Sequence, residues 1–159
     1  KLVLSTELTA FYQEEETEKA IAYGNLLHEI LSKIKAETDI NRVLNMFYLK
    51  GRITQEEKID YKTKLERLIQ NEEISPYFQN DIKVFRELSL YNSNGEVLRP
   101  DRIVKLKDGN YFILEYKTGQ ELEAHKKQLL DYIFVLKEAT QSEVGGALVY
   151  VEEEKMIRV

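Results

Sequence analysis

Apolar residues recur at helical spacing through the first half of the chain. This spacing predicts a helix over about 17–35 and a second over about 40–49, which Gly51 ends. The segment Thr54-Gln55-Glu56-Glu57 is a capping box and predicts a third helix that runs to about residue 70. Residues 1–80 should therefore be mainly helical.

From Asp81 the pattern changes to short apolar or alternating segments, which are typical of strands. The expected strands are 82–91, 97–107, 111–117 and 144–152, with a short edge strand at 156–159. Asn94-Gly95 and Asp108-Gly109 have the composition of hairpin turns and would join the first three strands. The segment 111–117 is richly apolar and should be central. A helix over 122–139 separates it from the fourth strand.

This order of elements predicts the fold class. Helices followed by a β-meander and then a strand-helix-strand unit make an α/β fold, in which helices flank a mixed β-sheet. No repeat, linker or low-complexity tract divides the chain, so we expect a single domain over 1–159, mainly helical at 1–80 and with its sheet core at 81–159. The chain begins with Lys1 instead of methionine, which suggests a piece excised from a longer polypeptide, although a trimmed chain would look the same.

Composition excludes some kinds of site. The chain has no cysteine, which rules out disulfides, thiolate zinc sites and iron–sulfur clusters. Its net charge of −5 argues mildly against independent binding to nucleic acid. A domain that attached domains deliver to DNA, however, needs little affinity of its own. The apolar runs are too short to span a membrane, and we see no signal peptide.

Two acids and a lysine have the spacing of a site for a divalent cation. Asp101 follows Pro100, and Glu115-Tyr116-Lys117 ends the central strand fourteen residues later. Carboxylates supply the hard oxygen ligands that Mg²⁺ or Mn²⁺ prefers, and the backbone carbonyl of Tyr116 is a further candidate ligand. Lys117 shares a strand face with Glu115 and would orient a water or neutralise charge on a phosphate. The expected chemistry is phosphodiester hydrolysis.

Glu115 also has a simpler interpretation. It ends the apolar segment 111–114, and an acid at the end of a buried strand needs a partner or a metal. An ion pair with Lys117 or with Arg102 would satisfy it equally well.

The position of Asp101 depends on the second hairpin. If Asp108-Gly109 forms a regular two-residue turn, Asp101 lies opposite Tyr116 and points away from Glu115. The metal hypothesis therefore requires a one-residue bulge or a bend near Pro100, and we predict such a bulge.

Four short motifs occur along the chain in an order that resembles a known family. They are Gly24-x-x-x-His28, Arg99-Pro100-Asp101-Arg102, Glu115-Tyr116-Lys117-Thr118-Gly119 and Gln128-x-x-x-Tyr132. Together they resemble the PD-(D/E)XK nuclease superfamily, and more narrowly the RecB-like nuclease domain at the C-terminus of RecB and AddA helicase–nucleases, the exodeoxyribonuclease V beta-subunit type. This resemblance implies a restriction-endonuclease-like core. Two positions depart from it: Glu115 replaces the usual aspartate, and Arg99 replaces the usual glycine.

The resemblance extends the candidate site. It implies that His28 is a metal ligand beside Asp101 and Glu115, and that Lys117 is the catalytic lysine. Gln128 and Tyr132 share a helix face at i and i+4, and would contact DNA or brace the site. Glu87 stands where some relatives carry an additional acid.

The implied function is a Mg²⁺-dependent DNA exonuclease domain that acts in double-strand break processing in the bacterial cytoplasm. Its partners would be DNA, helicase domains of the same polypeptide and a second helicase–nuclease subunit, with no membrane. One alternative is a catalytically inactive domain that guides DNA or docks a subunit. Another is a free-standing nuclease of the same superfamily.

Overall fold

The four predicted helices are present in the computed structural model, which describes the backbone of residues 2–159 and the side chains of residues 15–159. They are α1 (Leu2–Lys33), α2 (Ile40–Leu49), α3 (Gln55–Gln70) and α4 (Glu123–Thr140). Short 3₁₀ turns lie at Glu37–Asp39 and Ser75–Tyr77. Helix α1 begins earlier than its apolar pattern predicted, at Leu2. Lys1, on which the expectation of an excised chain rests, lies outside the described residues.

Local sequence explains where α2 and α3 begin and what they bury. At the start of α3 the Thr54 hydroxyl accepts a hydrogen bond from the Glu57 N–H (3.1 Å), and the Glu57 carboxylate accepts one from the Thr54 N–H (2.7 Å). These bonds satisfy backbone donors that have no partner within the helix. The buried side chains of α2 recur at helical spacing and face the core: Ile40, Val43, Leu44 and Phe47.

A five-stranded mixed sheet forms the centre of the molecule. Its strands are β1 (Lys83–Arg86), β4 (Arg102–Lys105), β5 (Tyr111–Lys117), β6 (Val144–Tyr150) and β7 (Lys155–Arg158), in the order β1-β4-β5-β6-β7. Strands β5 and β6 are parallel, and the other neighbours are antiparallel. The prediction that 111–117 is central is confirmed, as is a short edge strand at the C-terminal end.

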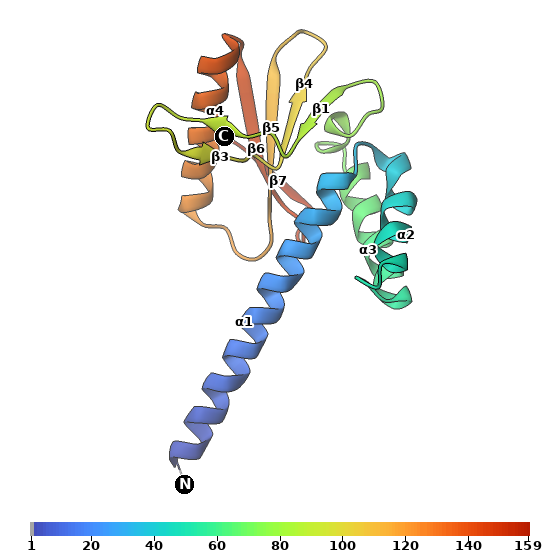
Figure 1. The fold of residues 1–159 in the computed structure, drawn as a ribbon, viewed down its shortest axis with the longest axis vertical. Coiled ribbons are helices and arrows are strands. Elements are labelled where there is room, and N and C mark those ends of the chain that lie inside the picture. Colours follow the sequence, from blue (N-terminus) through green and yellow to red (C-terminus); the bar gives the residue numbers. More distant parts are fainter. Residues whose placement is uncertain (1) are drawn as a thin grey trace.

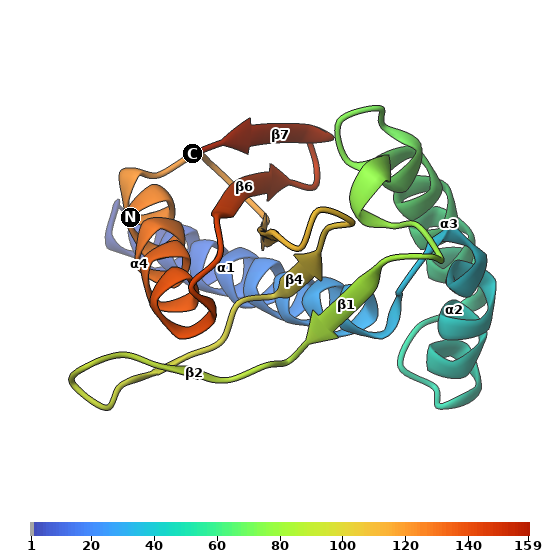
Figure 2. The same ribbon diagram turned by 90° about the horizontal axis from the view of Figure 1, so that it is seen from above.

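Two predicted strands are each interrupted, which corrects the sequence-based boundaries. The segment 82–91 divides into β1 and β2 (Leu90–Tyr91), and 97–107 divides into β3 (Val97–Leu98) and β4. Between β1 and β2, Glu87 has a positive φ of 61°, which extended strands do not adopt. Between β3 and β4, Pro100 lacks the N–H that a ladder needs. As a result β2 and β3 form a separate hairpin that turns at Gly95 and lies over α4 (Figures 1 and 2).

Helices cover both faces of the sheet. One apolar cluster joins α1, α2 and α3 to one face, through residues such as Leu27, Leu65 and Leu114. A second joins α4 and the β2–β3 hairpin to the other face, through Leu129, Leu90 and Ile113. The N-terminal part of α1 extends well beyond the sheet (Figure 1). Among the described residues, no helix is both long and apolar enough to cross a membrane.

Candidate functional site

The turn between β4 and β5 decides where Asp101 lies. The Leu106 N–H donates to the Asn110 carbonyl (2.8 Å), so the turn holds three residues instead of two, with Gly109 at a φ of 90°. Arg102 therefore pairs with Leu114, and Asp101 falls beside Glu115 on the same face. The extra residue lies in this turn and not near Pro100, so the predicted bulge near Pro100 is not what places Asp101, although the backbone bends at Asp101.

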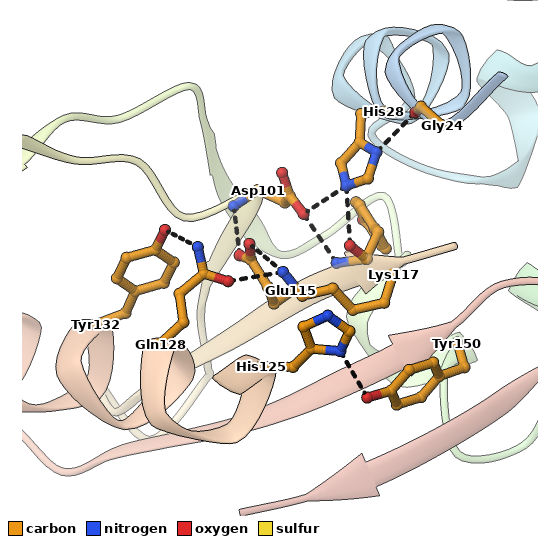
Figure 3. A network of polar contacts seen from close by, with 10 residues as sticks. Gly24, His28, Asp101, Glu115, Lys117, His125, Gln128, Tyr132 and Tyr150 are labelled. Carbon is orange, nitrogen blue, oxygen red and sulfur yellow. Dashed lines mark hydrogen bonds and ion pairs between the residues drawn. The ribbon is translucent and has the colours of Figure 1, made fainter. Parts of the chain in front are cut away.

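Pro100 explains why polar groups meet at the end of β5. Alternate residues of an antiparallel pair exchange backbone hydrogen bonds, and continuing the observed register would pair Pro100 with Tyr116. Because proline has no N–H, it cannot donate to the Tyr116 carbonyl. That carbonyl instead accepts from His28 Nε2 (2.9 Å), while the Tyr116 N–H donates to Asp101 Oδ2 (2.8 Å) (Figure 3). The interrupted ladder thus brings β5, β4 and α1 together.

His28 lies on the half of α1 that packs on the sheet, and both ring nitrogens contact oxygen atoms. Nδ1 is 2.8 Å from the Gly24 carbonyl, and Nε2 is 3.3 Å from Asp101 Oδ2. The hydrogen bond to the Asp101 carboxylate is the main reason that the pKa of His28 rises to about 9, against the effect of burial. The imidazole, the carboxylate and the Tyr116 carbonyl therefore converge at the end of β5, and their role as metal ligands stays a prediction.

Glu115 is buried, with 4% of its surface exposed, and it faces α4. Its carboxylate accepts the Asp101 N–H at Oε2 (3.2 Å) and lies 3.5 Å from Lys117 Nζ at Oε1. Burial and the neighbouring Asp101 carboxylate raise the pKa of Glu115 to about 7. Of the two expected ion pairs, the one with Lys117 forms. Arg102 lies on the opposite face and binds backbone carbonyls there instead.

Gln128 and Tyr132 hold Lys117 in place from α4. Lys117 Nζ donates to Gln128 Oε1 (2.7 Å), and Gln128 Nε2 donates to the Tyr132 hydroxyl (2.9 Å). Their shared helix face is confirmed, and their contacts fit the bracing role. His125 lies on the same face, one turn before Gln128, and its Nδ1 is 2.9 Å from the Tyr150 hydroxyl (Figure 3). Our sequence reasoning missed His125, although its i−3 spacing from Gln128 could have indicated it.

Glu87 lies farther from these residues. Its carboxylate pairs with Lys33 (3.4 Å), and it lines a cavity of about 540 Å³ together with His28, Asp101 and Arg99. This cavity gives solvent access to His28 and Asp101, whereas Glu115 does not line it. A wider hollow of about 760 Å³, between α4 and the β2–β3 hairpin, is lined by other residues.

The donor set fits a hard divalent cation, although its side chains are not arranged as a finished site. Across residues 15–159, no three His, Asp or Glu side chains form a group that could hold a metal. Asp101 and Glu115 each accept a backbone N–H, and His28 Nε2 lies against two oxygens. Two carboxylates, a carbonyl and an imidazole nevertheless make the oxygen-rich set that Mg²⁺ or Mn²⁺ uses. Coordination by His28 would require Nε2 to lose its proton.

The family profile of the PD-(D/E)XK nuclease superfamily matches residues 2–158. The chain belongs to this superfamily. Its α/β architecture agrees with a restriction-endonuclease-like fold, and members are generally nucleases that use divalent metal ions and act on DNA.

Other comparisons add little. No curated protein matches the chain. Among solved structures, the protein described as SSO0001 is 16% identical over 83% of this chain, with a TM-score of 0.37. The present chain spans 64% of that protein, which is less than two thirds of its length.

Proposed function

We propose that the protein is a Mg²⁺-dependent deoxyribonuclease that hydrolyses phosphodiester bonds. The observation that carries this proposal is the meeting of His28, Asp101 and the Tyr116 carbonyl at the end of β5, beside the Glu115–Lys117 pair. His28, Asp101, Glu115 and the Tyr116 carbonyl would hold the metal. A bound Mg²⁺ supplies charge stabilisation at the phosphate and a lowered pKa for an attacking water.

The protein's own groups would position the substrate and the water. Lys117 is held between Gln128 (2.7 Å) and Glu115 (3.5 Å), so its ammonium is fixed without being fully neutralised. A fixed cation of this kind stabilises the extra negative charge that a phosphate gains during attack. Arg99 lines the same cavity as Asp101 and adds positive charge there. The expected products carry a 5′-phosphate.

The finer assignment rests on the motifs. The spacing from Gly24 to Tyr132 supports a RecB/AddA-like exonuclease domain of a bacterial cytoplasmic helicase–nuclease, acting in double-strand break repair with helicase domains and a second subunit. The 159 residues would then form one nuclease domain within that assembly.

A second candidate is an inactive domain that guides DNA or docks a subunit. The net charge of −5 favours it, because a DNA-binding surface is usually basic. The near-complete ligand set argues against it, since a domain without chemistry has no physical need for a buried carboxylate paired with a lysine.

Cleavage of linear single-stranded DNA in Mg²⁺ separates these candidates. The proposed function predicts cleavage that a chelator abolishes and that Lys117→Ala lowers about 100- to 1000-fold. Lys62→Ala is the matched control, because Lys62 lies on α3 with 45% of its side chain exposed. If the wild-type protein cleaves no DNA even within its full-length polypeptide, the docking role is supported and the nuclease proposal fails.

A further inference from the structure

Helix α1 lies close to the end of β5 at Gly24. This glycine is buried, and a Cβ atom added to it would lie 2.8 Å from the Thr118 hydroxyl oxygen and 4.0 Å from Thr118 Cβ. Thr118 directly follows β5. The absence of a side chain at Gly24 is therefore what lets the helix backbone rest on the end of the central strand.

The same helical turn carries His28. The Gly24 carbonyl contacts His28 Nδ1 (2.8 Å), and His28 Nε2 contacts the carbonyl of Tyr116, two residues before Thr118 (2.9 Å). The contact at Gly24 and the contact at His28 thus join the same two segments, one helical turn apart. A change in the first separation must change the second.

The other end of α1 is fixed independently. The Arg102 guanidinium donates to the carbonyls of Ile34 (2.8 Å) and Lys35, directly after the helix. Arg102 also follows Asp101 in the chain, so this anchor ties the end of α1 to the strand that carries a candidate ligand. With this end held, the distance between α1 and β5 at His28 depends on how closely Gly24 and Thr118 approach.

We propose that Gly24 and Thr118 are positioning residues, whose close contact sets the separation of α1 and β5 and so places the His28 imidazole against the Tyr116 carbonyl and the Asp101 carboxylate. The effect on DNA cleavage rests on the proposed function. The placement of the imidazole does not, since it follows from packing alone.

Side-chain rotation at Thr118 gives limited relief from an added methyl group. Thr118 carries two heavy atoms on Cβ, so two of its three staggered rotamers direct one of them toward a given neighbour. Carbon and oxygen atoms in contact normally lie roughly 3.5 Å apart or more. In those two rotamers Gly24→Ala requires the helix to move outward near His28, although alanine favours a helix more than glycine does.

A double-mutant cycle in the metal-free protein tests this placement. The variants are Gly24→Ala, Thr118→Ala and both together, and the readout is the ¹H–¹⁵N spectrum of the His28 imidazole. The chain has only two histidines, so His125→Gln assigns the signals. We expect Gly24→Ala to change the shift that marks the hydrogen bond at Nε2, whereas Nδ1 should keep its shift because its partner, the Gly24 carbonyl, lies on the same helical turn. The double variant should restore the Nε2 shift, because the nearest remaining Thr118 atom would lie at 4.0 Å, an ordinary contact.

Two results would overturn the proposal. One is an unchanged His28 spectrum in Gly24→Ala. The other is a change in the His28 spectrum of Gly24→Ala that persists in the double variant. It would mean that the added methyl group disturbs His28 through the cavity that residue 24 lines, and not through contact with Thr118. Ala22→Gly, at an exposed position of the same helix, is the matched control for helix propensity and should leave the His28 signals in place.

Titration with Mn²⁺ alone and DNA cleavage extend the test. We expect Gly24→Ala to weaken Mn²⁺ binding and to lower cleavage about 10- to 100-fold in the wild-type background, but only a few-fold in the Thr118→Ala background. Equal losses in both backgrounds would contradict the proposal. If the wild-type protein cleaves no DNA, the proposed function fails, while the imidazole spectra still decide whether the contact positions His28.

Discussion

Arg102 and Glu115 are the two charged residues that the described part of the chain buries, and they satisfy their charges differently. They lie on neighbouring strands but face opposite sides of the sheet. Arg102 donates to three backbone carbonyls, those of Ile34, Lys35 and Tyr77, and its guanidinium lies 3.9 Å from the centre of the Phe78 ring. Glu115 instead lies beside a second carboxylate, that of Asp101, with Lys117 at 3.5 Å.

This difference separates a charge that is buried for structure from one that we propose is placed for chemistry. The donors of Arg102 meet neutral acceptors that join α1, the Ser75–Tyr77 turn and β4, so its burial orders the fold. Glu115 keeps a like charge nearby, and burial raises its pKa to about 7, so its ionised form is poorly compensated in the protein alone. A group left in this state is suited to bind a cation that the protein itself does not supply.

The largest expected effect concerns Arg102, whose charge is buried for structure. Arg102→Leu removes the donors of three carbonyls and should lower the free energy of unfolding by about 3 kcal/mol. Urea denaturation measures this, and Arg102→Lys should recover only part of the loss, because an ammonium cannot reproduce the planar fork of a guanidinium. Retention of full stability in Arg102→Leu would show that this charge does not hold the fold together.

Glu115→Gln tests the other side of the comparison through pH. The folded protein holds the Glu115 proton more tightly than the unfolded chain does, because the pKa rises from its ordinary value of 4.5 to about 7. Wild-type stability is therefore lost as pH rises from about 4.5 to 7, and Glu115→Gln should gain stability relative to wild type over this range. Unfolding in a chelator at several pH values measures this difference.

Glu123→Gln, at an exposed position of α4, is the control for that experiment. The free energies of unfolding of wild type and Glu115→Gln could instead differ by the same amount at every pH between 4.5 and 7. That result would mean that neighbouring groups stabilise the ionised Glu115 carboxylate, as they do the Arg102 guanidinium.

The smallest expected effect concerns the residue that holds Lys117. Gln128→Leu removes the acceptor 2.7 Å from Lys117 Nζ and should lower DNA cleavage about tenfold, since hydrogen bonds to charged groups contribute roughly 1.5 kcal/mol. Lys127→Leu, an exposed neighbour on α4, should cleave as wild type does. Equal activity of Gln128→Leu and wild type would show that Glu115 alone is enough to position Lys117.

Much of the fold could be predicted because its signals are local. Gly51 marks the end of α2, and the capping box at Thr54 marks the start of α3. The apolar run from Tyr111 identifies the central strand. The two strand interruptions were harder to predict. Pro100 is visible in the sequence, but no local signal marks the positive φ of Glu87, which lies between strands of two different sheets.

The identities of the candidate residues follow from the sequence alone, because carboxylates, an imidazole and a lysine in this order restrict the chemistry that the chain can perform. Only the tertiary structure decided their arrangement. One extra residue in the turn after β4 put Asp101 on the face of Glu115, and the packing of α1 brought His28 to the Tyr116 carbonyl. Register and helix packing depend on contacts between residues far apart in the chain, so side-chain periodicity within one segment cannot determine them.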